Sequence, residues 1–443
     1  MKPLLKISDA LLTQVLDDLD RPHDHAYERL GFLSFKVISN GEQPLLLCHD
    51  YHIIPDEHYI EDMSCGARMS EEAIHAAMQR SIDSGSGQLW VHTHGRDYST
   101  IPSPTDLEEG PKVARSISNI SPGQLHGWAV LSERSLSGQI LALDRTISPL
   151  QKMTVVGWPM TLYKGRDALF YENHTSQDDR YDRQSFLGND AAGVIAGAKI
   201  GIIGLGGGGS HINQQLAHIG FQNTVLCDYD TITNTNLNRL VGGTKGCVED
   251  ELDKTIVAEV LYRGLQPDAL IDSRPLRWEE KIEALNDCDV IIGCVDSFSA
   301  RRDIEYFCRA RMIPMIDIGM IVVNDLESPP RMHGQAAISI PGEICLHCLR
   351  VITEENLAEE AQDYGAGPQP QVVWPNGVLA STAIGYLMHL VTGWSRHGAM
   401  PARMDYNGIE QTLKPSGLLS LLSGIKCPHY SQKDLGDPVI KPL

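Results

Sequence analysis

The chain lacks several features that would each have pointed to a particular class of protein. No apolar run approaches the roughly 20 residues that a membrane-spanning helix requires, so we expect no membrane segment. Basic residues are in deficit, because 37 Lys and Arg stand against 57 Asp and Glu, giving a formal net charge of −20. This balance predicts no general attraction to nucleic acid or to anionic membrane surfaces.

Cysteine is scarce in the first half of the chain. Only Cys48 and Cys65 precede residue 227, and Cys345 and Cys348 form the one close pair among the ten cysteines. This spacing does not suit a disulfide framework. It favours a protein of the reducing cytoplasm, with room for a metal site.

A length of 443 residues predicts two or three domains. The apolar residues of 1–21 recur at helical spacing, which predicts a soluble helix rather than a signal peptide. Short apolar runs separated by polar breaks, with a helix at 70–81, predict a mixed α/β domain over 1–150. Residues 151–178 have no clear period, and we expect them to link this domain to a second one at 179–443.

The second domain has the pattern of a doubly wound parallel sheet. The segment AKIGIIGLGGGGSHINQQLAHIG predicts a buried strand, a Gly-rich turn and a helix, and NTVLCDYD predicts the next strand. Further strands are expected in CDVIIGCVD and IPMIDIGM, and helices at 254–264 and 378–392, with a polar loop at 353–375. The predicted fold class is therefore α/β, with a Rossmann-like second domain.

The stretch VHTHGRDYSTIPSPTD indicates a metal site in the first domain. Residues i and i+2 of a strand point to the same side, so His92 and His94 can face one ion while the following loop returns Asp106 to it. Two imidazoles and one carboxylate leave the fourth position for water, which is typical of catalytic zinc. The alternative is a pair of surface histidines.

The same residues resemble the JAB/MPN metalloprotease family, whose signature is an upstream Glu, then H-x-H, then Ser and Asp at fixed offsets. In the segment HAYERLGFLSF, Glu28 corresponds to this upstream glutamate. The resemblance implies that Glu28 is the general base and that Ser103 hydrogen-bonds the tetrahedral intermediate. Gly95 departs from the family, which usually has proline after the second histidine.

Four glycines, Gly204, Gly206, Gly207 and Gly209, lie between a predicted strand and helix, where backbone amides can hold a phosphate. Taken alone, this turn could serve NAD, FAD or ATP, or be a tight connection in any α/β fold. Asp228 ends the next strand, where a carboxylate can bind ribose hydroxyls. Asn236 and Arg239, which follow it, have no role in a dehydrogenase.

Five segments in order resemble the ThiF/MoeB/HesA and ubiquitin-activating enzyme family over residues 178–430: RYDRQ, the Gly-rich turn, CDYDTITNTNLNRL, the helix at Lys254 and CVDSFSARR. The resemblance implies a homodimer, with Arg183 reaching the partner's site. The remaining roles that it implies are ribose binding by Asp228, triphosphate binding by Asn236, Arg239 and Lys254, and Mg²⁺ binding by Asp296, with Asp230 also at the nucleotide site.

Cys345-Leu-His-Cys348 and the later Cys427-Pro-His429 suggest a structural zinc site. The MoeB-like branch closes such a site with two CxxC pairs, but Tyr430 stands where its fourth cysteine would be. Either His429 is the fourth ligand or the site is degraded. Residues 350–425 contain no cysteine, so by resemblance we expect adenylation without a thioester intermediate.

Together these motifs predict a cytoplasmic enzyme that uses ATP, Mg²⁺ and Zn²⁺. It would adenylate the C-terminal glycine of a ubiquitin-like protein and carry a deubiquitinase-like peptidase for the same terminus, in a bacterial stress or defence pathway. A conjugating-enzyme-like protein is a further expected partner. Two alternatives stay open: sulfur-carrier activation for thiocarboxylate-dependent biosynthesis, and a scaffold with an inert JAB fold. An NAD-dependent oxidoreductase is disfavoured by Asn236, Arg239 and Lys254.

Overall fold

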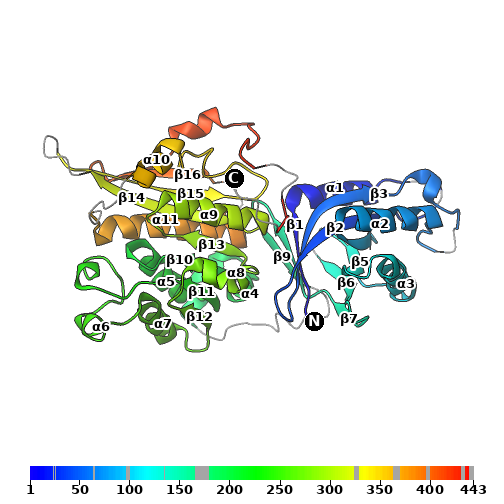
Figure 1. The fold of residues 1–443 in the computed structure, drawn as a ribbon, viewed down its shortest axis with the longest axis horizontal. Helices are drawn as coiled ribbons and strands as arrows, with labels where there is room; N and C mark the ends of the chain where they lie inside the picture. The colour runs from blue at the N-terminus through cyan, green and yellow to red at the C-terminus, as the bar shows by residue number, and fades with distance from the viewer. Residues whose placement is uncertain are drawn as a thin grey trace.

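The protein forms two lobes, each built on one β-sheet (Figure 1). Helices α1 to α3 belong to the first lobe and α4 to α11 to the second. The computed structural model describes residues 1–22, 24, 26–62, 65–95, 100–133, 135–164, 179–323, 329–362, 370–395, 400–430 and 435–438.

The N-terminal lobe contains a nine-stranded mixed sheet. Its strands, in spatial order, are β7 (Ile147–Pro149), β6 (Leu136–Leu141), β5 (His126–Leu131), β4 (Gly87–His92), β2 (Leu30–Ile38), β3 (Leu45–Ile53), β1 (Leu4–Ser8), β8 (Lys152–Val156) and β9 (Thr161–Lys164). Its helices are α1 (Asp9–Leu19), η1 (Asp56–His58), α2 (Glu71–Ser84) and α3 (Pro104–Ile120). The expected helix at 70–81 and the mixed α/β character are confirmed.

The first 21 residues are not one helix, so that prediction is wrong. Strand β1 lies between β3 and β8 and is parallel to both, and α1 begins only after it. Ser8 caps this helix, because its hydroxyl accepts the amide of Leu11 at 3.2 Å. The strand partners of β1 are about 40 and 150 residues away in the sequence, beyond the reach of a local periodicity.

The segment 151–178, expected to be a linker, begins with two strands of the N-terminal sheet. Strand β8 pairs with β1 over its whole length, and β9 pairs with β8. The N-terminal sheet therefore extends to residue 164 rather than ending near 150, while 165–178 lie outside the described residues.

The second lobe contains an eight-stranded sheet whose first five strands are parallel. In spatial order the strands are β12 (Leu270–Arg274), β11 (Asn223–Cys227), β10 (Lys199–Ile203), β13 (Val290–Gly293), β14 (Met315–Val323), β15 (Arg331–Ser339), β16 (Arg403–Asn407) and β17 (Thr412–Pro415). The parallel order, with the first strand at the centre, is the Rossmann-like arrangement that the sequence predicts.

Helices cover both faces of this sheet, as a doubly wound fold requires. The larger ones are α5 (Gly207–Ile219), α7 (Lys254–Leu265), α9 (Phe298–Ala310) and α11 (Val373–Thr392), and the shorter ones are η2 (Asp179–Leu187), α4 (Ala191–Gly197), η3 (Asn234–Asn236), α6 (Lys245–Glu249), η4 (Trp278–Lys281), α8 (Ile282–Leu285), α10 (Glu354–Gln362) and η5 (Gly417–Leu421). Helix α10 lies in the segment 353–375 expected to be a polar loop, so part of that prediction is wrong. None of the described helices has the length and apolar character needed to cross a bilayer.

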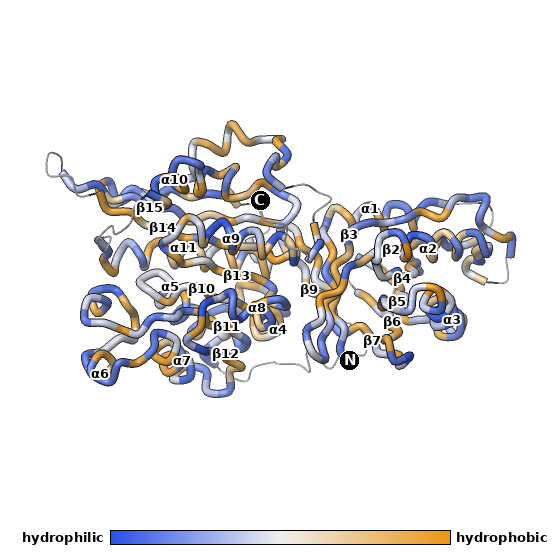
Figure 2. The backbone as a smooth tube through the Cα atoms, in the orientation of Figure 1, coloured by the Kyte–Doolittle hydropathy of each residue, from blue (hydrophilic) through white to orange (hydrophobic). Residues whose placement is uncertain are grey.

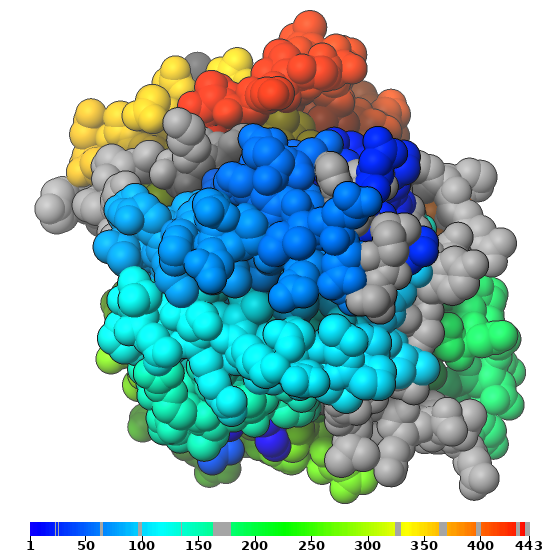
Figure 3. All heavy atoms as spheres, turned by 90° about the vertical axis from the view of Figure 1, so that its right-hand side faces the viewer, coloured from blue at the N-terminus to red at the C-terminus, as the bar shows by residue number. Residues whose placement is uncertain are grey.

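One hydrophobic core is continuous between the lobes. Leu45, Leu47 and Val156 of the N-terminal sheet belong to the same buried cluster as Ile200 and Leu216 of the second lobe. Figure 2 shows apolar segments of both sheets where the lobes meet. Viewed from the N-terminal side, that lobe covers much of the second, with C-terminal segments of the chain visible above it (Figure 3). The two lobes are therefore packed together rather than tethered by a linker.

A buried ion pair joins the lobes beside this core. Asp289, just before β13, is 1% exposed, and Lys152 Nζ of β8 donates to both of its carboxylate oxygens at 2.7 Å. The backbone amide of Lys199 donates to the same carboxylate at 2.9 Å. Lys6 of β1, also buried, donates to the carbonyl of Cys288 at 2.8 Å, and burial lowers its pKa to about 8.

Replacing Lys152 by Met removes the cation that balances a buried carboxylate. We expect Lys152→Met to lower the free energy of unfolding by about 3–5 kcal/mol, since breaking a buried pair leaves an uncompensated charge. Lys112 pairs with the exposed Glu108 and Glu109, so Lys112→Met is a matched control with an expected loss of about 0–1 kcal/mol. Urea denaturation of both variants measures the difference, and equal losses would contradict the assignment.

Candidate functional site

The Gly-rich turn between β10 and α5 has a conformation that requires glycine. Gly204 has φ +91°, and a Cβ at Gly209 would lie 1.9 Å from the carbonyl oxygen of Gly204. Gly206 precedes the first turn of α5, and a Cβ there would meet nothing within 4 Å. The turn thus exposes its backbone next to the amides that begin α5, where a phosphate can bind.

Two carboxylates and one lysine lie at the carboxyl ends of the neighbouring strands. Asp228 follows β11, and its carboxylate accepts the amides of Leu205 at 2.7 Å and Asp230 at 2.9 Å. Lys254, the first residue of α7, places Nζ 2.5 Å from Asp230 and 3.7 Å from Asp228. Burial raises the pKa of Asp228, while the charge of Lys254 opposes that shift. The structure therefore brings the expected ribose and triphosphate residues together.

The other expected nucleotide residues lie on adjacent loops. Arg239 lies against the turn, because a Cβ at Gly207 would be 3.3 Å from its Cδ. Asn236 lies on the preceding η3, where its side-chain oxygen accepts the amide of Thr233 at 3.0 Å. Asp296 is exposed on the loop that joins β13 to α9, and that loop touches the turn at Gly204. Arg239 and the loop of Asp296 therefore adjoin the Gly-rich turn, and Asn236 lies three positions before Arg239.

Arg183 does not join this group. Its segment η2 is anchored at the opposite end of α5, where Gln184 donates to the carbonyl of Ile219 at 3.3 Å and Arg180 donates to that of Leu265 at 2.7 Å. A helix of 13 residues is about 20 Å long, so the exposed Arg183 lies far from the Gly-rich turn of its own chain.

Sequence reasoning missed Asn376, a buried residue at the start of α11. Its side-chain nitrogen would lie 2.5 Å from a Cβ at Gly207, so the amide group packs against the Gly-rich turn. Helix α11 therefore begins at the same place as α5. The available signal was a polar residue between Pro375 and Gly377, at the start of an otherwise apolar helix.

The N-terminal lobe gathers a second group of side chains at the carboxyl end of β4. Nε2 of His92 lies 3.3 Å from Nε2 of His94 and 3.1 Å from Asp106, and Nε2 of His94 lies 3.3 Å from the other Asp106 oxygen. Ligands held at roughly 2.05 Å by a tetrahedral zinc ion are about 3.3 Å apart. One carboxylate oxygen of Glu28 lies within 4.8 Å of both histidine ligand atoms. The donor set and its spacing fit zinc.

Asp106 and Ser103 hold each other at the start of α3. Ser103 Oγ accepts the amide of Asp106 at 3.2 Å, and the Asp106 carboxylate accepts the amide of Ser103 at 2.6 Å. The pKa of Asp106 is lowered to about 2, because its interactions with His92 and Ser103 outweigh the opposing effect of burial. Gly95 has φ +117°, which proline cannot adopt, so a proline at this position would require a different turn.

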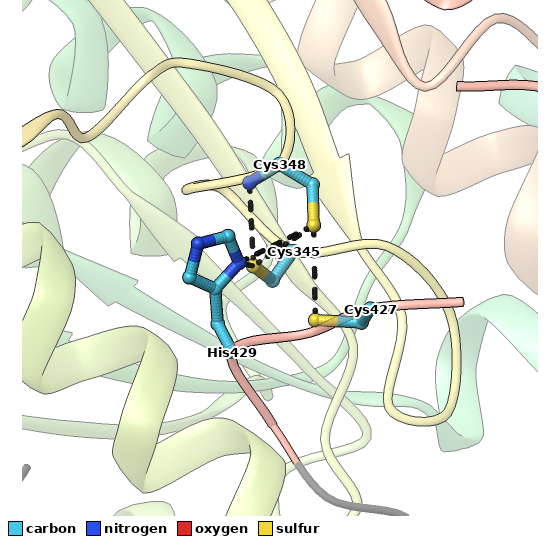
Figure 4. A group of neighbouring side chains, drawn as sticks. All are labelled: Cys345, Cys348, Cys427 and His429. Atoms are coloured by element: carbon cyan, nitrogen blue, oxygen red, sulfur yellow. Dashed lines mark hydrogen bonds between the residues drawn. The ribbon is translucent and has the colours of Figure 1, made fainter. Parts of the chain in front are cut away.

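Four side chains of the second lobe form a compact cluster (Figure 4). Sγ of Cys348 lies 3.6 Å from Sγ of Cys345 and 3.8 Å from Sγ of Cys427, and Nδ1 of His429 lies 3.4 Å from the first two sulfurs. Around a tetrahedral zinc ion two thiolates are about 3.8 Å apart, and a thiolate and an imidazole nitrogen about 3.5 Å. The cluster fits zinc, with His429 as the fourth ligand.

A buried carboxylate supports the loop between the first two cysteines. Glu305 of α9 is fully buried and accepts the amide of Leu346 at 2.7 Å. Its carboxylate also accepts the hydroxyls of Ser339 at 2.5 Å and Tyr430 at 3.5 Å. Tyr430 therefore helps to support the cluster, from the position where the resemblance to the MoeB-like branch predicts a fourth cysteine.

We expect two zinc ions per chain, one in each lobe. Cys427→Ser and His92→Ala should each lower the zinc content from two to one, since each removes a ligand from a different site. Cys247→Ser, at a cysteine outside both clusters, should leave it at two. Elemental analysis of the purified proteins measures the zinc content. An unchanged zinc content in Cys427→Ser would show that the cluster of Cys345 does not bind zinc as assigned.

The comparisons with known proteins each match a part of this chain. The SAMP-activating enzyme E1 of Haloferax volcanii is 28% identical over 213 residues, covering 47% of this chain and 72% of that protein. The molybdopterin-synthase adenylyltransferase of Haemophilus influenzae is 27% identical over 36% of this chain and 63% of its own length. The ubiquitin-like modifier-activating enzyme 5 of Dictyostelium discoideum is 25% identical over 47% of this chain, and the match spans only 55% of that relative.

Among solved structures, E. coli MccB with MccA-N7isoASN aligns with 57% of this chain and 74% of its own, at 21% identity and a TM-score of 0.46. The sequence model of the ThiF family matches residues 181–418, more than half of the 443 residues. The chain therefore belongs to the ThiF family.

Proposed function

We propose that the second lobe adenylates the C-terminal carboxylate of a ubiquitin-like or sulfur-carrier protein. The observation that carries this proposal is the convergence of the Gly-rich turn, Asp228 and Lys254 at the carboxyl edge of the parallel sheet. The names of the relatives, which include a ubiquitin-like modifier-activating enzyme and a molybdopterin-synthase adenylyltransferase, support the same reaction class.

The charges at this edge suit the reaction. A carboxylate oxygen of the substrate attacks the α-phosphorus of ATP, the bond to the bridging oxygen breaks, and pyrophosphate leaves. Two anions must approach, so Lys254 and Arg239 lower the repulsion, and Asp296 would hold the Mg²⁺ that neutralises the leaving phosphates. Lys254 is already fixed by Asp228 and Asp230, which limits its reorganisation.

The position of Arg183 favours a homodimer that shares its sites. This arginine is exposed at the end of α5 remote from the Gly-rich turn. An arginine there can stabilise transferred phosphate only in a second copy of the chain, across a two-fold interface.

Two inactive variants can test this arrangement. Arg183→Ala and Lys254→Ala chains are mixed in equal amounts and left until their subunits have exchanged, so that half of the dimers contain one chain of each kind. If Arg183 acts in trans, one of the two sites in each mixed dimer has both residues intact. We expect the mixture to recover about one quarter of the wild-type ATP–pyrophosphate exchange, although each variant alone is inactive. A mixture that stays inactive after confirmed subunit exchange would contradict the trans role.

We propose a second activity, a zinc-dependent peptidase or isopeptidase of the JAB/MPN type, for the N-terminal lobe. The specific observation is that Nε2 of His92 and Nε2 of His94 lie 3.3 Å apart, the spacing of two ligands on a tetrahedral zinc ion, with one oxygen of Asp106 near each and the carboxylate of Glu28 beside them. The two lobes would then act on one substrate class, one cleaving after a terminal glycine and the other activating it.

The residues of this site have distinct parts in the proposed reaction. His92, His94 and Asp106 would hold zinc, which when bound polarises the scissile carbonyl and lowers the pKa of water. Glu28 takes a proton from the attacking water and delivers it to the leaving amine. Ser103 hydrogen-bonds the oxyanion, and its hydroxyl is held in place by the cap that it forms with Asp106.

Glu28→Gln keeps the size of this side chain but removes its basicity. We expect the cleavage rate to fall by about 10²–10⁴-fold with the zinc content unchanged. The substrate is a ubiquitin-like protein encoded beside this chain and extended beyond its terminal glycine, and intact mass spectrometry measures the cleavage. Glu57→Gln, another upstream glutamate that is exposed on η1, is the control and should cleave normally. Equal rates in the two variants would end the case for Glu28 as the base.

The same experiment separates the remaining alternatives. If ATP converts the trimmed product to an adenylate that sulfide then turns into a thiocarboxylate, the sulfur-carrier alternative gains. If the zinc-loaded wild type binds the substrate and never cleaves it, the peptidase proposal is wrong, and the alternative of a scaffold with an inert N-terminal lobe gains. The absence of cysteine from residues 350–425 supports adenylation without a thioester in either case.

A further inference from the structure

The loop that carries Glu28 is fixed by a second loop, which contains Gly66. The backbone amides of Tyr27 and Glu28 both donate to the carbonyl oxygen of Gly66, each at 2.9 Å. Two consecutive amides on one acceptor leave little freedom in the backbone at Glu28. The main chain of Gly66 therefore sets where the Glu28 side chain begins.

The absence of a side chain at Gly66 also leaves the space that the carboxylate of Glu28 occupies. A Cβ at Gly66 would lie 2.2 Å from Oε2, 2.5 Å from Cδ and 2.9 Å from Oε1 of Glu28. Carbon and oxygen atoms in ordinary contact are roughly 3.5 Å apart, so no side chain fits there while Glu28 keeps its place. The carboxylate is therefore close both to the bare Cα of Gly66 and to the ligand nitrogens of His92 and His94.

Arg29 holds the other side of the same loop. Its guanidinium group is almost fully buried and donates to the carbonyls of Arg21 at 2.7 Å and Pro22 at 3.1 Å, and to Asp56 at 2.8 Å. The next amide, that of Leu30, donates to the hydroxyl of Tyr59 at 2.8 Å. The backbone is therefore fixed both before and after Glu28.

We propose that Gly66 is a positioning residue that holds the carboxylate of Glu28 against the His92 and His94 site. This inference rests on the proposed peptidase function. A general base acts only within hydrogen-bond reach of the proton that it takes, and a displacement of about 1 Å can cost about 10²-fold in rate. Gly66 makes no contact with substrate in this proposal and acts only through Glu28.

Gly66→Ala tests the proposal, with Gly123→Ala as its control. A Cβ at Gly123 would meet nothing within 4 Å, and its φ is not in the left-handed region. We expect Gly66→Ala to keep two zinc ions and normal ATP–pyrophosphate exchange, while its cleavage rate falls by about 10²-fold or more. Gly66→Ala/Glu28→Gln should be no slower than Glu28→Gln, since both changes remove the same function.

A spectroscopic readout separates displacement of Glu28 from general damage. With cobalt(II) in place of zinc, Gly66→Ala and Glu28→Gln should change the visible absorption spectrum in the same direction, and Gly123→Ala should leave it unchanged. A wild-type cleavage rate and spectrum in Gly66→Ala would overturn the proposal. An inactive wild type with bound zinc would instead overturn the peptidase function itself.

If Gly66→Ala loses zinc, replacing Glu28 by the shorter aspartate tests whether the loss arises through Glu28. Aspartate withdraws the carboxylate from the added methyl group, so Gly66→Ala/Glu28→Asp should recover the zinc content and thermal midpoint of Glu28→Asp. Failure to recover them would show that the effect of the methyl group does not pass through Glu28, and the proposal would be wrong.

Discussion

The carboxylate of Asp289 holds the two sheets in their relative positions. It lies at the start of β13 and receives hydrogen bonds from Lys152 of β8 and from the backbone of Lys199 at the start of β10. The amino ends of the central parallel strands are thereby fixed to β8, the strand next to the edge of the N-terminal sheet. Ligands of doubly wound sheets bind at the carboxyl ends of the strands, so this junction lies at the end of the sheet opposite to the proposed nucleotide site.

Helices α5 and α11 extend this arrangement across the second lobe. Both begin at the Gly-rich turn, where Asn376 packs against Gly207, and α11 ends near the junction, where His389 stacks on Trp158 with 5.1 Å between ring centroids. His389 follows Asn376 by 13 positions in the helix, a rise of about 20 Å. The Gly-rich turn is therefore remote from the N-terminal lobe of the same chain, so cleavage and activation of one substrate terminus are separate binding events in the proposed scheme.

The sequence predicts well what depends on local pattern. The strand, turn and helix around Gly204, and the short offsets from His92 to Asp106, lie in single segments, so their geometry follows from chain order. The structure adds what depends on distant segments. Strand β1 needs β3 and β8 as partners, and Asn376 meets the turn only because α11 folds back beside α5. The closeness of Gly66 to Glu28, on which its proposed role rests, is likewise invisible in the sequence, because the contact crosses 38 positions.

The place of β8 in the N-terminal sheet has a consequence for any division of this polypeptide. A fragment that stops at residue 150 lacks β8 and leaves β1 as an open edge, with a row of unpaired backbone amides and carbonyls beside Leu45 and Leu47. Open apolar edges of this kind associate with other strands. The first lobe is thus completed by β8, which a domain boundary at residue 150, drawn from the hydrophobic pattern, removes. A fragment cut there would be prone to self-association.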